Sequence, residues 1–363
     1  MVENVRHERE AEVGTTFPVG GRAVLCNFCK HWYIQPCNKV TQVKCPNMIA
    51  KRGQQGSEQA SIRHHYIPVF YLKRWGGEDK KICEFSRPYK LIYTKRIYPV
   101  QTGFVDRLYE MKGVPTEMAQ VVEDEFIKPA DSLAARSLSM LKSNNERITF
   151  ESKYRSAWSL FLMTLLMRMP EDLEFLGQAL ADDWQRELPK MKERYVTKRR
   201  TNDPPTLQEF IDQNDPHHMS RWTLDVATKL MDHERIGQLL NDMRWFVLTT
   251  SGDAPQLLTS DRPILISGAL TEADAYLFLP LGPRRLFVAT SNIEVEQRIR
   301  RRPINEVVDG ANKLVVQHAI KYVYGADDGG KMFVDENIGK SRPKSLMQKL
   351  REYRNEKAAA RKK

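Results

Sequence analysis

Residues 61–75 read SIRHHYIPVFYLKRW, two histidines followed by a run of aromatic and aliphatic side chains and then by Lys-Arg-Trp. Pro68 prevents a long helix here, because its ring fixes the backbone and removes an amide donor. We therefore predict an extended entry followed by a short helix or turn. The aromatic half is expected to pack into the core. The histidine pair, and His65 more than His64, is left as the candidate for chemistry.

The rest of the chain combines helical and strand-like segments. Residues 80–96 form two arms rich in β-branched and aromatic residues, which predicts a β-hairpin. Residues 115–143 and 149–169 are helical in pattern, and the second is apolar nearly all round, as in a helix at the centre of a core. From Arg244 onward, four apolar segments separated by turn residues predict an antiparallel sheet. The predicted fold class is α+β, with central helices, an N-terminal hairpin and a C-terminal antiparallel sheet.

Composition divides the chain into segments. We predict disorder for residues 1–20, a cysteine-rich module at 21–49, a linker at 50–60, a main α+β domain at 61–339 and a basic helical tail at 340–363. Within the main domain, a helix is predicted for residues 171–188. The basic and then proline-rich stretch 189–205 is predicted to be a surface excursion.

Four of the five cysteines lie within 20 residues, at Cys26, Cys29, Cys37 and Cys45. A Cys-x2-Cys pair places two thiolates at two corners of a tetrahedron from one turn, and two further thiolates complete a structural zinc site. The second pair lacks this spacing, so four reduced, partly buried thiols are the alternative. We predict a small zinc-knuckle-like module, folded by the bound zinc.

The net charge of +11 belongs to the two ends of the chain. Residues 340–363 contain ten Lys/Arg and two Glu, residues 1–60 contain eight basic and five acidic residues, and the remaining 279 contain 39 of each sign. A basic tail attracts polyanions without sequence selectivity, although it can also be only a solubilising helix. We predict nucleic acid as a partner, bound by the tail and the Arg298–Arg302 region, with a protein partner as the alternative.

Neither a membrane nor a secretory route is expected. The richest apolar candidate, residues 157–169, is shorter than the ~18 residues of a membrane span. The charged N-terminus lacks the apolar core of a signal peptide. A cytoplasmic location is therefore the expectation.

The segment His65–Leu72, HYIPVFYL, resembles the hallmark of a bacterial family known as domain of unknown function 4238. Val69 departs from the family pattern, which usually has glutamine there. Further similarities are Glu125 on a helix, Arg168-Met169-Pro170, the TSDRP segment Thr259–Pro263 and the LPLGP segment Leu279–Pro283. The resemblance covers about residues 61–325. Because the family has no established activity, the resemblance supports the domain more than the function.

Five polar residues adjoin strongly apolar segments and form the predicted site: His64, His65, Glu125, Arg168 and Asp261. Buried charges need partners. In one cleft, His with Asp and Glu would hold a divalent metal, or His would act as general base, while Arg168 contacts a phosphate. In the structural alternative, Asp261 bonds backbone N–H groups in a turn, Arg168 pairs with Glu125 or Asp261, and His65 bonds a backbone carbonyl.

The sequence contains no Gly-rich phosphate loop, Gly-x-Ser-x-Gly elbow or His-Glu-x-x-His helix, so kinase, P-loop, Rossmann and zincin functions are unsupported. We predict a cytoplasmic, nucleic-acid-associated protein with metal-dependent nuclease as its candidate activity. The alternative is a non-catalytic, zinc-containing binding or adaptor protein. The first requires an open cleft at the polar residues, and the second requires that they be paired internally.

Overall fold

The computed structural model describes residues 22–25, 32–35, 62–143, 151–250, 252–341 and 343–360. The chain forms two compact units, Met1–Gln59 and Ala60–Lys363. In the first, strands β1 (Arg22–Leu25) and β2 (Trp32–Gln35) pair antiparallel. The four cysteines predicted to bind zinc (Cys26, Cys29, Cys37 and Cys45) lie outside the described residues, as do residues 1–20 and 50–60. Zinc and disorder therefore stay predictions.

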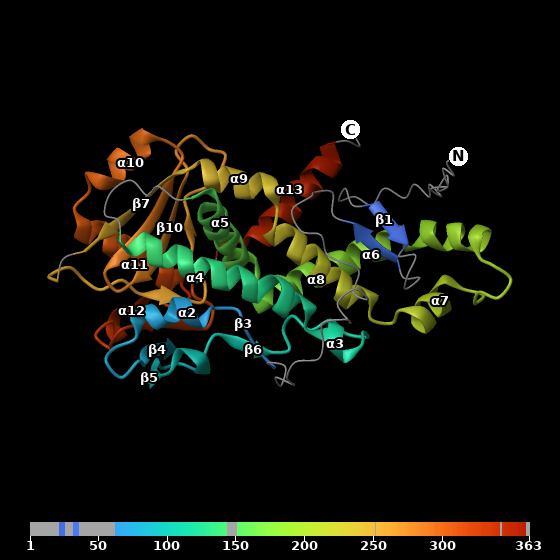
Figure 1. Cartoon of the computed structure of the whole chain (residues 1–363), viewed down its shortest axis with the longest axis horizontal. Coiled ribbons are helices and arrows are strands. Elements are labelled where there is room, and N and C mark those ends of the chain that lie inside the picture. Colours follow the sequence, from blue (N-terminus) through green and yellow to red (C-terminus); the bar gives the residue numbers. More distant parts are fainter. Residues whose placement is uncertain are drawn as a thin grey trace, which may run out of the picture. The chain divides into compact units, whose positions relative to one another are not determined.

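The second unit, called the body below, is a mixed α+β structure, which confirms the predicted class. In Figure 1 the sheet with β7 and β10 lies at one end of the body and α7 at the other, with helices between them. No helix of the described residues combines the length and apolar character needed to cross a membrane.

The predicted C-terminal antiparallel sheet is present, with strand order β7-β11-β10-β9. Its strands are β7 (Arg244–Thr249), β9 (Leu265–Ile266), β10 (Tyr276–Gly282) and β11 (Arg285–Thr290). Because side chains alternate along a strand, Phe246 and Val288 face helices α10 (Ile293–Arg300) and α11 (Ile304–His318). Trp245 and Phe287 point the other way, into the main core. The sheet is therefore buried on both faces.

The predicted hairpin is also present, as β4 (Ile82–Ser86) and β5 (Tyr93–Ile97). It is half of a second four-stranded sheet, of order β5-β4-β12-β8. The added strands are β12 (Tyr322–Gly325) and β8 (Thr259–Ser260), both paired antiparallel. This sheet was not predicted, because strands so far apart in sequence leave no local signal of their pairing.

The stretch His64–Trp75 follows the prediction closely. Strand β3 (Arg63–His65), paired with β6 (Phe104–Asp106), leads through Pro68 into helix α2 (Val69–Leu72) and a 3-10 turn, η1 (Lys73–Trp75). Tyr71 and Trp75 are fully buried. The Tyr71 hydroxyl donates to Pro280 O in β10 (2.9 Å) and lies 2.7 Å from Thr259 Oγ1 in β8. This side chain thus joins the two sheets.

Helices fill the space beside the sheets. They are α3 (Thr116–Ala119), the π-helical turn η3 (Glu123–Ile127), α4 (Lys128–Ser143), α5 (Ser152–Met167), α6 (Pro170–Lys198), α7 (Leu207–Asn214), α8 (His218–Met231) and α9 (Glu234–Asp242). Trp158, Phe161 and Leu162 of α5 are fully buried, as its apolar pattern predicts. Arg168 caps α5 and Pro170 starts α6, so the chain turns between these helices.

Helix α6 continues ten residues beyond its predicted end, from Leu188 to Lys198. The predicted surface excursion therefore begins later than expected. Pro189 lies inside the helix, where it removes one amide donor. Tyr195 accounts for the extension, because its ring packs on Phe210 of α7 and its hydroxyl donates to Pro204 O at 2.7 Å.

The C-terminal residues end in α12 (Lys331–Asn337) and α13 (Leu346–Ala360). Helix α13 packs on α6: Arg351 pairs with Asp182 at 2.7 Å, Arg354 pairs with Asp183, and Met347 is buried. Two arginines of the basic tail are therefore paired with carboxylates of the body.

Candidate functional site

The predicted site residues occupy different elements of the body. His64 and His65 lie on β3, Glu125 in η3, Arg168 at the end of α5 and Asp261 directly after β8. The structure places Arg168 near His65 and near the carboxyls of η3 and α4. Asp261 is engaged elsewhere, and Glu125 is exposed.

His64 is fully buried and bonded through both ring nitrogens. The Tyr109 backbone N–H donates to Nδ1 at 2.8 Å, so Nδ1 carries no proton in this arrangement. Nε2 then donates to Gln120 Oε1 at 2.6 Å. The ring also stacks on Tyr109, with centroids 5.5 Å apart. These contacts give His64 a structural role, fixing the 109–120 loop on β3.

His65 is partly exposed. Its Nε2 lies 3.3 Å from Val100 O, and its ring packs beside Phe104. Burial lowers the pKa of His65, and the positive charge of Arg168 acts in the same direction. The imidazole is therefore neutral at physiological pH, a form that can accept a proton. The carbonyl contact also matches the structural alternative.

Arg168 is fully buried, although it carries a guanidinium. Its Nη1 donates to Asp131 Oδ1 of α4 at 2.9 Å, and the Tyr109 hydroxyl donates to its backbone carbonyl at 3.0 Å. The predicted partner, Glu125 or Asp261, is therefore replaced by Asp131. Nε and Nη2 have no hydrogen-bond partner among the described residues. A planar fork with two open donors suits a carboxylate or phosphate.

The buried carboxyl of η3 is Glu123, not Glu125. Glu123 is 7% exposed and its Oε2 has no hydrogen-bond partner in the described part of the chain. Burial raises the pKa of Glu123 to about 7, opposed by Lys128 and Arg168. Burial likewise raises the pKa of Asp131, opposed by the charge of Arg168. Arg168, Asp131 and Glu123 are called the Arg168 cluster below.

A sequence signal for the Arg168 cluster exists in the spacing of η3 and α4. Glu123, Ile127 and Asp131 recur every four residues, the spacing of one helix face. Ile127 and Glu123 are buried, and Asp131 is partly buried, where it meets Arg168. The position of Glu125 next to Phe126 is a weaker indication of a buried carboxyl than this four-residue period. Glu123 lies in the π-helical turn η3, a kind of turn that is frequent at functional positions.

Asp261 is fully buried and bonded to backbone alone. Its carboxylate accepts the N–H groups of Ile320, Lys321 and Tyr322 at 2.9, 2.6 and 3.0 Å. Burial raises the pKa of Asp261 to about 6, opposed by these three hydrogen bonds. The next residue, Arg262, pairs with Asp172 of α6 at 2.9 Å. Asp261 therefore fixes the start of β12. As in the structural alternative, its carboxylate accepts backbone N–H groups, but these belong to a distant segment and not to its own turn.

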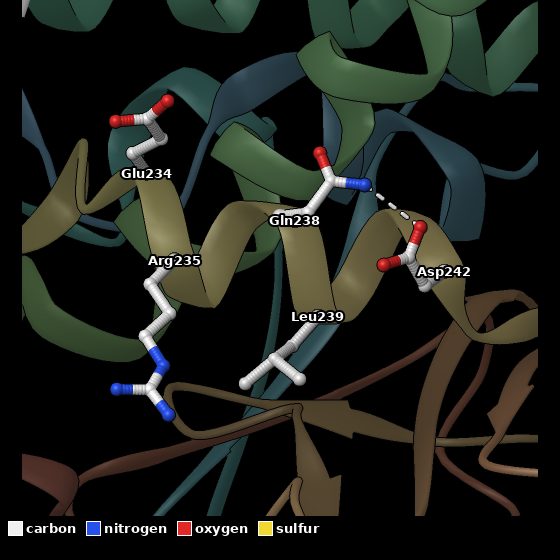
Figure 2. A pocket seen from close by; sticks show the side chains of 5 residues that line it. All are labelled: Glu234, Arg235, Gln238, Leu239 and Asp242. Atoms are coloured by element: carbon white, nitrogen blue, oxygen red, sulfur yellow. Dashed lines mark hydrogen bonds between the residues drawn. The ribbon is translucent and has the colours of Figure 1, made fainter.

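Within the described ranges, no three His, Cys, Asp or Glu side chains lie close enough together to hold a metal ion. A divalent metal in the main domain stays a prediction. A surface hollow shown in Figure 2 is lined by five side chains of α9, with Gln238 donating to Asp242 at 2.7 Å. It includes no residue of the Arg168 cluster.

In the described residues, the fold and the site define a mixed α+β protein. Its two four-stranded antiparallel sheets are joined by a buried aromatic segment, and it carries an arginine–carboxylate cluster. Residues 63–329 match the model of the family described as Protein of unknown function (DUF4238). The chain belongs to this family, as the HYIPVFYL, RMP, TSDRP and LPLGP segments predicted. Comparison with curated proteins and with solved structures gave no match.

Proposed function

We propose that this protein is a nucleic-acid-associated binding protein whose body is a non-catalytic scaffold. The observation that carries the proposal is a contrast between the buried polar groups, which have partners in the body, and a group of arginines at the surface. Inside, Asp261 and His64 are bonded to the protein itself. Outside, Arg298, Arg301 and Arg302 are exposed and make no ion pair with any described residue. Clustered, unmatched arginines at a surface attract phosphates.

The neighbouring Arg300 provides an internal comparison. It pairs with Glu296 at 2.9 Å and covers the Phe246 ring at 4.1 Å, so its charge is already used by the body. The zinc-knuckle-like module at Cys26, Cys29, Cys37 and Cys45 is proposed as a second contact with the partner.

The binding test measures fluorescence anisotropy of labelled DNA and RNA with the full chain, over a range of salt. Affinity should fall as salt rises, because Lys and Arg displace counterions from phosphates. The Arg298→Ser, Arg301→Ser, Arg302→Ser variant should bind more weakly and with a shallower salt slope, while Arg300→Ser should change both less. Binding that is absent, or that does not depend on salt, would refute the proposal.

A second candidate, phosphodiester hydrolysis, is favoured by the Arg168 cluster alone. Arg168 has two guanidinium nitrogens open within the described structure, and Glu123 exchanges a proton near neutral pH. Arg168 would contact the phosphate, Glu123 would serve as general acid or base, and His65 as base. The full burial of Arg168 opposes this function, because substrate reaches that guanidinium only if covering residues move. Binding is therefore the first candidate.

The hydrolysis test incubates DNA and RNA with the protein, with added Mg²⁺ or Mn²⁺ and with a chelator. Glu123→Gln and Glu125→Gln are the matched pair, since the first removes a buried carboxyl and the second an exposed one two residues away. We expect no cleavage by the wild type. If the wild type does cleave, and cleavage is lost in Glu123→Gln but kept in Glu125→Gln, the function is phosphodiester hydrolysis and not binding alone.

A further inference from the structure

The β4–β5 hairpin exposes large aromatic and aliphatic side chains at the surface of the body. Tyr89 is 81% exposed, Leu91 73% and Tyr93 56%. They lie in the turn and at the start of β5, and with Lys90 they line one shallow hollow. Tyr98, just after β5, is 45% exposed. Large apolar groups gathered at a surface indicate an interaction site.

The same hairpin is strongly basic. Residues 80–101 contain six Lys or Arg and a single acidic residue, Glu84. Glu84 is buried and pairs with Lys95 at 2.9 Å, so it offers no negative charge to the surface. A surface of this composition favours a polyanion.

Not every positive charge of the hairpin is available. Asp335 pairs with Arg87, Asp79 pairs with Arg96 at 2.6 Å, and Lys95 is the partner of Glu84. Lys80, Lys81 and Lys90 have no carboxylate partner within the described ranges, and Lys81 Nζ lies 5.2 Å from the Tyr98 ring. Lysines therefore accompany the tyrosines at both ends of β5, with Lys90 between Tyr89 and Tyr93 in the hollow.

The position of β5 leaves this surface open to a ligand. β5 is the edge strand of its sheet, and in Figure 1 the hairpin lies at the margin of the body. Tyr93 and Lys95 are two residues apart on one strand, so they share a face. Because Lys95 is paired with Glu84, the lysine between the tyrosines that supplies positive charge is Lys90. An extended chain of alternating rings and phosphates matches the order Tyr89, Lys90, Tyr93.

We propose that residues 80–101 bind single-stranded nucleic acid, with bases stacked on Tyr89 and Tyr93 and phosphates held by Lys90 and its neighbours. The inference rests on the proposed function and specifies its ligand and surface. A single strand is favoured over a duplex because only unpaired bases offer their faces to tyrosine rings. It is favoured over an added protein strand because Lys95 and Arg96 lie on the edge, where lysine and other charges oppose strand addition.

The test uses the full chain and a labelled oligothymidylate of about 15 nucleotides, long enough to cross such a surface. The Tyr89→Ser, Tyr93→Ser variant keeps all charges and should bind at least about tenfold more weakly, because stacking on each ring contributes to affinity. Its salt slope should be unchanged. Tyr353→Ser is the matched control, since Tyr353 of α13 is 60% exposed and lies outside the hairpin. Lys90→Ser should instead reduce the salt slope.

The outcomes separate the two proposals. If the wild type binds no nucleic acid, the proposed function and this inference both fail. If it binds and the double tyrosine variant binds equally well, or if duplex binds as tightly as single strand, only the hairpin inference fails. A changed oligomeric mass of the double variant in light scattering, with nucleic-acid binding intact, would assign the hairpin to a protein contact and overturn the inference. Unchanged thermal unfolding of the variants would show that lost binding reflects the removed rings.

Discussion

The raised pKa of Glu123 predicts that the body becomes less stable as the pH rises from about 4.5 to about 7. The folded state holds the Glu123 proton with a pKa of about 7, against an ordinary value of 4.5. Between these values the native state binds more protons than the unfolded chain, so stability falls as pH rises. The penalty is complete above about pH 7 and absent below about pH 4.5.

Its magnitude follows from the shift. At about 1.4 kcal/mol for each pKa unit, the shift from 4.5 to about 7 gives a penalty of at most about 3.5 kcal/mol, and relaxation around an ionised Glu123 brings it to about 1–3 kcal/mol. Glu123→Gln has nearly the same shape and cannot ionise. The variant should therefore exceed the wild type in stability by this amount at about pH 8 and differ little at about pH 5.

Urea unfolding followed by circular dichroism at several pH values measures the difference directly. Glu125→Gln is the control, because an exposed carboxyl should change stability by less than about 0.5 kcal/mol at every pH. A difference between Glu123→Gln and wild type that does not vary with pH would refute the reasoning. A wild type that gains on the variant as pH rises would show that Arg168 stabilises ionised Glu123 more than burial destabilises it.

Two further predictions concern residues with structural roles. Asp261→Ala leaves three backbone N–H groups of residues 320–322 without their acceptor and should cost about 3–5 kcal/mol in urea unfolding, while the exposed Asp274→Ala should cost less than about 0.5. Equal stability of the two variants would contradict the role given to Asp261. Metal analysis after gel filtration should find stoichiometric zinc in the wild type. The Cys26→Ser variant should contain less zinc, and the Cys83→Ser variant should not. A wild type without zinc would contradict the predicted zinc site.

Local patterns in the sequence were sufficient for much of the fold. The hairpin at β4 and β5, the buried aromatic residues from Tyr66 to Trp75 and the apolar helix α5 each carry their own period, and each is where its pattern predicts. The pairing of Phe85 with Val323 has no such signal, because either strand would look the same beside another partner. That the hairpin, β12 and β8 form one sheet is therefore seen only in the structure and cannot be predicted from the sequence.

The partners of buried polar groups are harder to predict than their burial. Arg168 and Asp261 adjoin apolar segments, a position that predicts burial, and both are fully buried. Which acceptor or donor each one meets depends on how distant elements pack. Asp131 reaches Arg168 because α4 lies against the end of α5, and residues 320–322 reach Asp261 because β12 lies beside β8.

Burial is the main cause of the raised pKa of Glu123, and the negative charge of Asp131 in the Arg168 cluster acts in the same direction. One guanidinium can balance one carboxylate, and Asp131, at 2.9 Å, is the carboxylate that it contacts. If Glu123 also ionised, the buried group would carry a net negative charge, which burial strongly disfavours. Glu123 therefore retains its proton until about pH 7. Replacing Asp131 by Asn would remove this neighbouring negative charge, so the pKa of Glu123 should fall, while burial keeps it above the ordinary value.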